Sequence, residues 1–133
     1  MYIVDTHAII WFIEGNPNLS ETAKNLMVNK PDEIMISCVS LWEIAIKISI
    51  RKLELEQPFE EIIKKVEELW NINYYLPPEL FSFIEKLPFH KINGIEHRDP
   101  FDRMLIAQSL TTNIPIISCD EKFDLYPEIN RIW

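Results

Sequence analysis

The chain has 133 residues, of which 47% are hydrophobic, and a formal net charge of −8. This length predicts a single domain, 1–133, with enough apolar residues for a substantial core. No apolar run approaches the roughly 20 residues of a membrane span, and the acidic balance argues against a general nucleic-acid-binding protein. With only two glycines, Gly15 and Gly94, the chain has no glycine-rich phosphate loop.

The first residues contain no basic stretch, so we expect no signal peptide. Cys38 and Cys119 are the only cysteines, and they lack the spacing of metal ligands. Both follow apolar β-branched runs, which predicts buried free thiols in a reducing cytoplasm.

Residues 2–4 are short, apolar and β-branched, which is typical of a buried parallel strand. Asp5 follows at the carboxyl end of that strand, and Thr6 can cap a helix over 7–14 that ends at Gly15. Open α/β sheets bind ligands at the carboxyl ends of their strands. Asp5 is therefore either a helix cap or a ligand, and the sequence leaves both interpretations open.

A second helix is expected from Ser20 to about residue 29, and a second strand over 34–38. A longer helix opens near Ser40 and runs to about residue 53. Its polar residues form a stripe along one face: Ser40, Glu43, Lys47 and Arg51. Glu43 either forms an ordinary exposed pair with Lys47 or faces Asp5, which would place Lys47 and Arg51 along the approach of an anionic substrate.

Three scaffold elements follow, namely an amphipathic helix, a strand and a short helix, over 58–70, 72–76 and 79–87. Residues 88–98 are expected to form a loop. Its two histidines, His90 and His97, are weak candidates for a metal site, because hard cations bound by carboxylates prefer oxygen.

Residues 99–108 predict the abrupt start of a helix that continues to about residue 112. Pro100 suits the first helical position, Asp99 the cap before it, and Asp102 the first turn. Capping and the helix dipole alone would explain both acids. A fourth strand is expected over 115–118, with Asp120 two residues beyond it, and residues 131–133 could add an edge strand.

The order of these elements, joined by right-handed crossovers, predicts an α/β fold with a parallel sheet flanked by helices. Asp5, Glu43, Asp102 and Asp120 would then meet at one edge of the sheet. Carboxylates that close together repel unless they are protonated or bind cations, and an oxygen-only site selects Mg²⁺ or Mn²⁺. Such ions orient and activate water for phosphodiester hydrolysis.

Four sequence blocks resemble the PIN-domain ribonucleases, and specifically the VapC-type toxins of toxin–antitoxin pairs. They are residues 2–8 with Trp11, 40–47, 97–108, and 116–120 with Phe123. The resemblance spans essentially the whole chain and implies a three-layer α/β/α domain that cleaves single-stranded RNA with Mg²⁺ or Mn²⁺. It also implies that Asp5 and Asp102 are the principal metal ligands, and that Glu43 and Asp120 position water or a second ion.

The same resemblance implies a homodimer that a cognate antitoxin holds inactive and that inhibits translation or growth when free. Asp99 is assigned to the helix cap, although it could contact metal through water. Arg98 and Arg103 could contact substrate phosphate or neutralise the nearby acids. Residues 91–96 resemble an insertion relative to the family's usual short link, and could alter the substrate groove or the dimer contact.

Two other functions remain to be weighed. One is a non-catalytic α/β binding module with acidic helix caps and no metal, which a calorimetric titration with Mn²⁺ would separate from a nuclease. The other is phosphate-ester transfer on a haloacid-dehalogenase-like fold. That fold requires a second aspartate two residues after the first, and here the position is His7.

Overall fold

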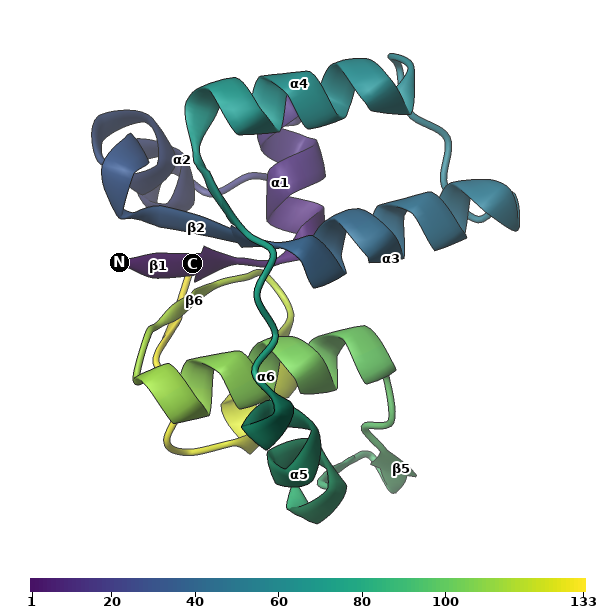
Figure 1. Ribbon diagram of the computed structural model, residues 1–133, viewed down its shortest axis with the longest axis vertical. Helices are drawn as coiled ribbons and strands as arrows, with labels where there is room; N and C mark the ends of the chain where they lie inside the picture. Colours follow the sequence, from purple (N-terminus) through teal and green to yellow (C-terminus); the bar gives the residue numbers. More distant parts are fainter.

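The computed structural model describes residues 1–133 and contains a five-stranded sheet with helices on both faces (Figure 1). All neighbouring strands are parallel, in the order β3-β2-β1-β6-β7. Their bounds are Tyr2–Val4 for β1, Ile34–Ser37 for β2, Asn71–Asn73 for β3, Ile116–Ile117 for β6 and Arg131–Ile132 for β7. The predicted fold class, a parallel sheet between helical layers, is confirmed.

Six α-helices cover the sheet, and α5 and α6 lie on the face opposite α1 and α4 (Figure 1). They are α1 (Thr6–Ile13), α2 (Glu21–Asn29), α3 (Cys38–Ser49), α4 (Phe59–Leu69), α5 (Pro78–Lys86) and α6 (Pro100–Thr112). Two short 3₁₀ helices, η1 (Pro31–Glu33) and η2 (Glu121–Leu125), complete the chain. None of the helices combines the length and apolar character that crossing a bilayer requires.

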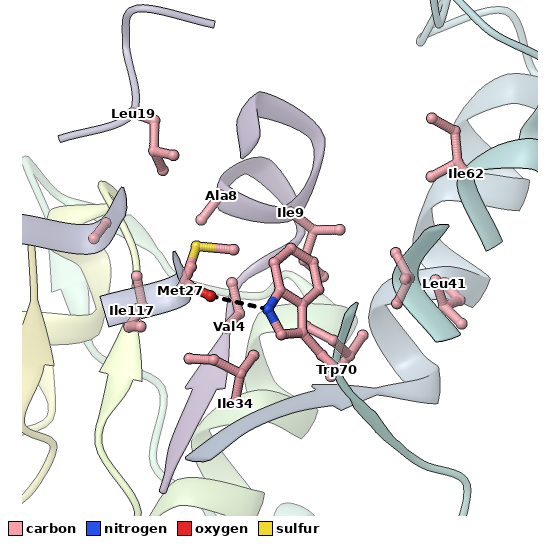
Figure 2. Close-up of a cluster of buried hydrophobic side chains, with 13 residues drawn as sticks. Val4, Ala8, Ile9, Leu19, Met27, Ile34, Leu41, Ile62, Trp70 and Ile117 are labelled. Atoms are coloured by element: carbon pink, nitrogen blue, oxygen red, sulfur yellow. Dashed lines mark hydrogen bonds between the residues drawn. The ribbon is translucent and has the colours of Figure 1, made fainter. Parts of the chain in front are cut away.

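The core is divided between the two faces of the sheet, because successive residues of a strand point to opposite sides. Val4 belongs to a cluster with side chains of α1, α2 and α4, whereas Ile3 belongs to a second cluster with side chains of α6 and η2. In the first cluster the indole N–H of Trp70 donates to the carbonyl of Met27 at 3.2 Å (Figure 2). Burial of β1 on both faces fixes Asp5 at its carboxyl end.

Helix α3 differs from the prediction at both ends. It begins at Cys38 rather than near Ser40, because the Ser37 side chain caps it by accepting the N–H of Val39 at 3.2 Å. It ends at Ser49, and Arg51 adopts a left-handed conformation with φ of 58°. Arg51 therefore does not continue the polar stripe of the helix.

Residues 88–98 form more than the predicted loop. Strands β4 (Lys91–Ile92) and β5 (Ile95–Glu96) pair antiparallel around Asn93 and Gly94, whose φ values are 52° and 80°. A two-residue turn with positive φ at both positions suits Asn-Gly and closes a hairpin tightly. The prediction of a plain loop was wrong because it overlooked this turn signal.

The two cysteines are free, but each is only partly buried. Cys38 lies at the end of β2 and Cys119 beyond the end of β6. Both thiols thus lie at the carboxyl edge of the sheet rather than in the core, which corrects the prediction of fully buried side chains.

Candidate active site

Asp5 is held at the end of β1 by three protein groups from two ends of the chain. As the cap of α1, its Oδ1 accepts the backbone N–H of Thr6 at 2.7 Å. Its Oδ2 accepts the hydroxyl of Ser118, at the end of β6, at 2.8 Å, and lies 4.0 Å from His7 Nδ1. Asp5 is only 3% exposed, so it is both a helix cap and a buried carboxylate at the sheet edge.

Glu43 projects from α3 toward the same place. Its Oε2 accepts the hydroxyl of Thr6 at 2.5 Å, and its Oε1 is paired with the ammonium of Lys47. Glu43 is as buried as Asp5, at 3% exposed. The pair with Lys47 is therefore present, but it is not the exposed surface pair considered from the sequence.

Asp99 and Asp102 occupy the start of α6 in different ways. One oxygen of Asp99 accepts the backbone N–H groups of Phe101 and Asp102 at 2.9 and 3.1 Å, as the capping prediction requires. Asp102 Oδ2 is instead hydrogen-bonded to His97 Nε2 at 2.8 Å. Asp99 therefore stabilises the helix, while Asp102 is left to interact with side chains.

Asp120 caps η2 beyond the end of β6. Its Oδ1 accepts the backbone N–H of Lys122 at 2.9 Å, and its Oδ2 lies 3.4 Å from the ammonium of the same lysine. Asp120 thus reaches the same edge of the sheet from a fourth segment of the chain, after Asp5, Glu43 and Asp102.

Electrostatics join these acids into one cluster. Burial, together with the charges of Asp99, Asp5, Asp120 and Glu43, raises the pKa of Asp102 to about 8. Burial also raises the pKa of Asp5, helped by Glu43 and opposed by other neighbouring groups. The structure therefore brings all four predicted acids, together with Asp99, within mutual electrostatic range. We call these five residues the acidic cluster.

Hydrogen-bond donors of the protein set the orientations of the carboxylate side chains in the acidic cluster. No group of three His, Cys, Asp or Glu side chains is arranged to hold a metal ion. Asp5 is turned to Ser118, Asp102 to His97, and Glu43 to Lys47. The oxygen-only donor set nevertheless suits Mg²⁺ or Mn²⁺, and a cation would offset the repulsion that, after burial, contributes to the raised pKa of Asp102.

The three predicted phosphate-binding residues have different surroundings. Burial lowers the pKa of Lys47, but its bond to Glu43 and the nearby acids outweigh this effect and raise it, so Lys47 is a charged group at the cluster. Arg98 is exposed, and its Nε donates to Glu96 at 2.7 Å. Arg103 is 5% exposed and donates only to backbone carbonyls, those of Ile84, Leu87 and Pro88. This placement contradicts the suggested phosphate contact for Arg103.

Sequence reasoning missed the roles of Thr6, Ser118 and His97, whose side chains form hydrogen bonds with the acids. The sequence does contain a signal for the two hydroxyls, because each lies just after a strand and close to an aspartate. Thr6 directly follows Asp5, and Ser118 comes two residues before Asp120. His97 is 4% exposed, and burial, followed by the charge of Lys122, lowers its pKa, so the imidazole is neutral at neutral pH. His97 was considered only as a metal ligand, whereas here it is a hydrogen-bond partner of Asp102.

These observations define an α/β protein with an oxygen-rich acidic cluster at the carboxyl edge of a parallel sheet, where such folds place their ligands. The family model of the PIN domain matches residues 2–129, nearly the whole chain. The protein belongs to the PIN domain family, which confirms the resemblance noted from the sequence. Comparison with curated proteins by sequence gives no match.

Three solved structures have the same fold. VapBC2 from Rickettsia felis, bound to a DNA fragment from its promoter, matches with a TM-score of 0.64 and 16% identity over 98% of this chain and 96% of that chain. FitAcB from Neisseria gonorrhoeae matches with a TM-score of 0.64 and 12% identity, over 100% of this chain and 97% of that chain. FitAB bound to an IR36 DNA fragment matches with a TM-score of 0.65 and 11% identity, over 99% of this chain and 94% of that chain. At these identities the likeness shows a shared fold.

Proposed function

We propose that this protein is a Mg²⁺- or Mn²⁺-dependent endoribonuclease that cleaves single-stranded RNA and acts as the toxin of a toxin–antitoxin pair. The observation that carries the proposal is the convergence of carboxylates from four segments of the chain. Only two ammonium groups, those of Lys47 and Lys122, are paired with them. Such a cluster favours cation binding, and membership in the PIN domain family supports a nuclease.

In this proposal Asp5 and Asp102 are the principal ligands, and Glu43 and Asp120 position water or a second ion. A bound divalent cation would lower the pKa of a water molecule and stabilise the leaving oxygen of a phosphodiester. The hydroxyls of Thr6 and Ser118 fix Glu43 and Asp5, so that little reorganisation of these groups is needed.

The proposal needs no covalent intermediate on the protein. Cys119 precedes Asp120 in the chain, and burial, followed by the charges of Asp5 and Asp120, raises the pKa of its thiol. A thiol with a raised pKa is a poor nucleophile, because the thiolate is the reactive form. Direct attack by water is therefore the reaction that these surroundings favour.

A hollow beside the cluster offers a place for the substrate. It has a volume of about 320 Å³ and is lined by Ile92, Ile95, Glu96, His97, Arg98, Asp99 and Lys122. The charged ends of Arg98 and Lys122, with Lys47 at the cluster, would meet the phosphates of a single strand. The RNA strand would reach the carboxylates from the side of the β4–β5 hairpin.

An exposed apolar stripe along α3 and its C-terminal cap, Ile50, suits a protein partner. Trp42 is 59% exposed and Ile50 54%, with Ile46 between them at the spacing of one helix face. The Trp42 ring lies against Phe101 at 5.2 Å, beside the acidic cluster. In this proposal such surfaces are covered by a cognate antitoxin or by a second copy in a homodimer in the cytoplasm. The shared fold with VapBC2 and FitAB supports this assignment.

The decisive experiment compares the wild-type protein with Asp5→Asn on single-stranded RNA. Asparagine retains the oxygen that caps α1, so the variant should fold and yet lose cleavage with Mn²⁺ as well as growth arrest on induction. Asp32→Asn, an exposed acid away from the cluster, is the matched control. Undiminished cleavage by Asp5→Asn would exclude the proposed chemistry.

One observation favours a second function, a binding module without metal. Asp5, Asp99 and Asp120 each cap a helix, and capping alone would explain why these positions are acidic. Calorimetric titration with Mn²⁺ separates the two functions, because a module of this kind would give no heat and no thermal shift.

A further inference from the structure

The side chain of His97 has a single polar contact, which is with Asp102. Its Nε2 lies 2.8 Å from Asp102 Oδ2, whereas its Nδ1 is buried without a hydrogen-bond partner. The ring also packs against Tyr126, with centroids 6.2 Å apart. When Asp102 is ionised, the ring proton is favoured at Nε2, because the carboxylate accepts it there and no group accepts a proton at Nδ1.

The backbone around His97 holds the ring in place relative to α6. Its N–H donates to the carbonyl of His90 at 2.8 Å and closes the base of the β4–β5 hairpin. The residue after Asp102, Arg103, stacks on Phe89 with its guanidinium carbon 4.1 Å from the ring centroid. It also donates to three carbonyls just before Phe89, those of Ile84, Leu87 and Pro88. Helix α6 thus fixes the entry to the hairpin, and the exit of the hairpin returns to α6 through His97.

We propose that His97 is a positioning residue, which donates its Nε2–H to Asp102 Oδ2 and leaves Asp102 Oδ1 free to bind a cation. The inference rests on the proposed function and extends it. A carboxylate that binds a cation is ionised, so the imidazole must be the donor. Partners of this kind orient metal-binding side chains and change metal affinity when they are lost. The hairpin then has a defined role, because it presents the ring.

The alternative is that His97 merely fills space beside Tyr126, and two substitutions separate the explanations. In His97→Gln the amide nitrogen can reach the place of Nε2, whereas in His97→Asn it reaches only the place of Nδ1. Both remove the ring. If His97 positions Asp102, glutamine should retain the donor and asparagine should lose it.

The measurement is Mn²⁺ affinity by titration calorimetry, with the melting temperature in chelator recorded for each variant. We expect His97→Asn to bind Mn²⁺ about 10–100-fold more weakly and His97→Gln to remain within a few-fold of wild type. His90→Gln is the matched control and should bind as wild type, because His90 packs edge-on against the same Tyr126, at 4.7 Å, without contacting Asp102.

RNA cleavage gives a second readout. In His97→Asn, kcat at low Mn²⁺ should fall and recover as Mn²⁺ is raised, with KM for RNA unchanged. Equal Mn²⁺ affinity in wild type and His97→Asn would overturn the inference, as would equal losses in the Asn and Gln variants. Failure of the wild-type protein to bind Mn²⁺ would overturn the proposed function as well, so the two failures are distinguishable.

Discussion

The substitution Asp102→Asn should remove a pH dependence from the free energy of unfolding. The folded protein holds the Asp102 proton up to a pKa of about 8, whereas the unfolded chain releases it near the usual 3.8. The group therefore stabilises the fold fully below the unfolded pKa, and this contribution is lost as the pH rises through the folded pKa. Asparagine does not titrate, and its oxygen can still accept a hydrogen bond from His97.

The size of the effect follows from the two pKa values. Each pH unit between them changes the free energy of unfolding by about 1.4 kcal/mol, and the change levels off above the folded pKa. Only the lower half of the interval from about pH 7 to pH 9 lies below the folded pKa. The expected loss in the free energy of unfolding over this interval is therefore about 1.4 kcal/mol. For a domain of this size, this loss corresponds to a fall in melting temperature of about 5 °C.

The assay is thermal unfolding followed by circular dichroism, in chelator, for wild type and Asp102→Asn over this pH range. Only the difference between the two proteins matters, because other groups titrate in both. Adding Mn²⁺ should then stabilise wild type and leave Asp102→Asn unchanged, since a ligand stabilises only the state that binds it. Asp124→Asn is a suitable control, because the bond from Arg131 lowers the pKa of Asp124 and no titration is expected there above neutrality. A pH dependence in Asp102→Asn equal to that of wild type would refute the reasoning.

Four further substitutions test the surroundings of the site. Arg103→Met should lower the free energy of unfolding in urea by about 3 kcal/mol, because three hydrogen bonds from a charged donor are lost and the carbonyl of Leu87 is left without a partner; a neutral effect would contradict a structural role. Trp70→Phe leaves one buried carbonyl of α2 unpaired and should cost about 1–3 kcal/mol in the same assay. Gly94→Ala should cost about 1–2 kcal/mol at a φ of 80°, measured by thermal unfolding. Lys47→Met removes the positive partner of the buried Glu43, so the melting temperature should fall in chelator and recover with Mn²⁺; a raised KM for RNA without this pattern would make Lys47 a substrate contact.

The sheet and the place of Asp5 could be predicted because they depend on local pattern. Residues 2–4 are apolar throughout, and a strand of this kind is buried on both faces, so the next polar residue lies at the sheet edge. The cap at Asp99 was equally predictable, since Pro100 fixes the first helical position after it. In these places the local preference and the tertiary contacts agree.

The surroundings of the acids could not be read in the same way. Arg98 and Arg103 both lie close to Asp102 in sequence, yet one is exposed and the other is buried against the end of α5. Adjacent residues of a helix point about 100° apart, so Arg103 faces a different neighbour from Asp102. Which neighbour lies there depends on how α5 packs, and no periodicity in the sequence specifies that contact. His97 depends in the same way on the closure of the hairpin.

Most of the donors around the acidic cluster are neutral groups, and only the ammonium groups of Lys47 and Lys122 bring positive charge to it. Asp5 is bound by a hydroxyl and a backbone N–H, Asp99 by backbone N–H groups, and Asp102 by a neutral imidazole. Arginine would neutralise carboxylates more strongly than any of these, and Arg103 is adjacent to Asp102 in the chain, but its guanidinium is bound to carbonyls elsewhere. Neutral donors orient a carboxylate without satisfying its charge. A fold that uses them here, in a chain of net charge −8, accepts lower stability without a cation and keeps the oxygen atoms available for one.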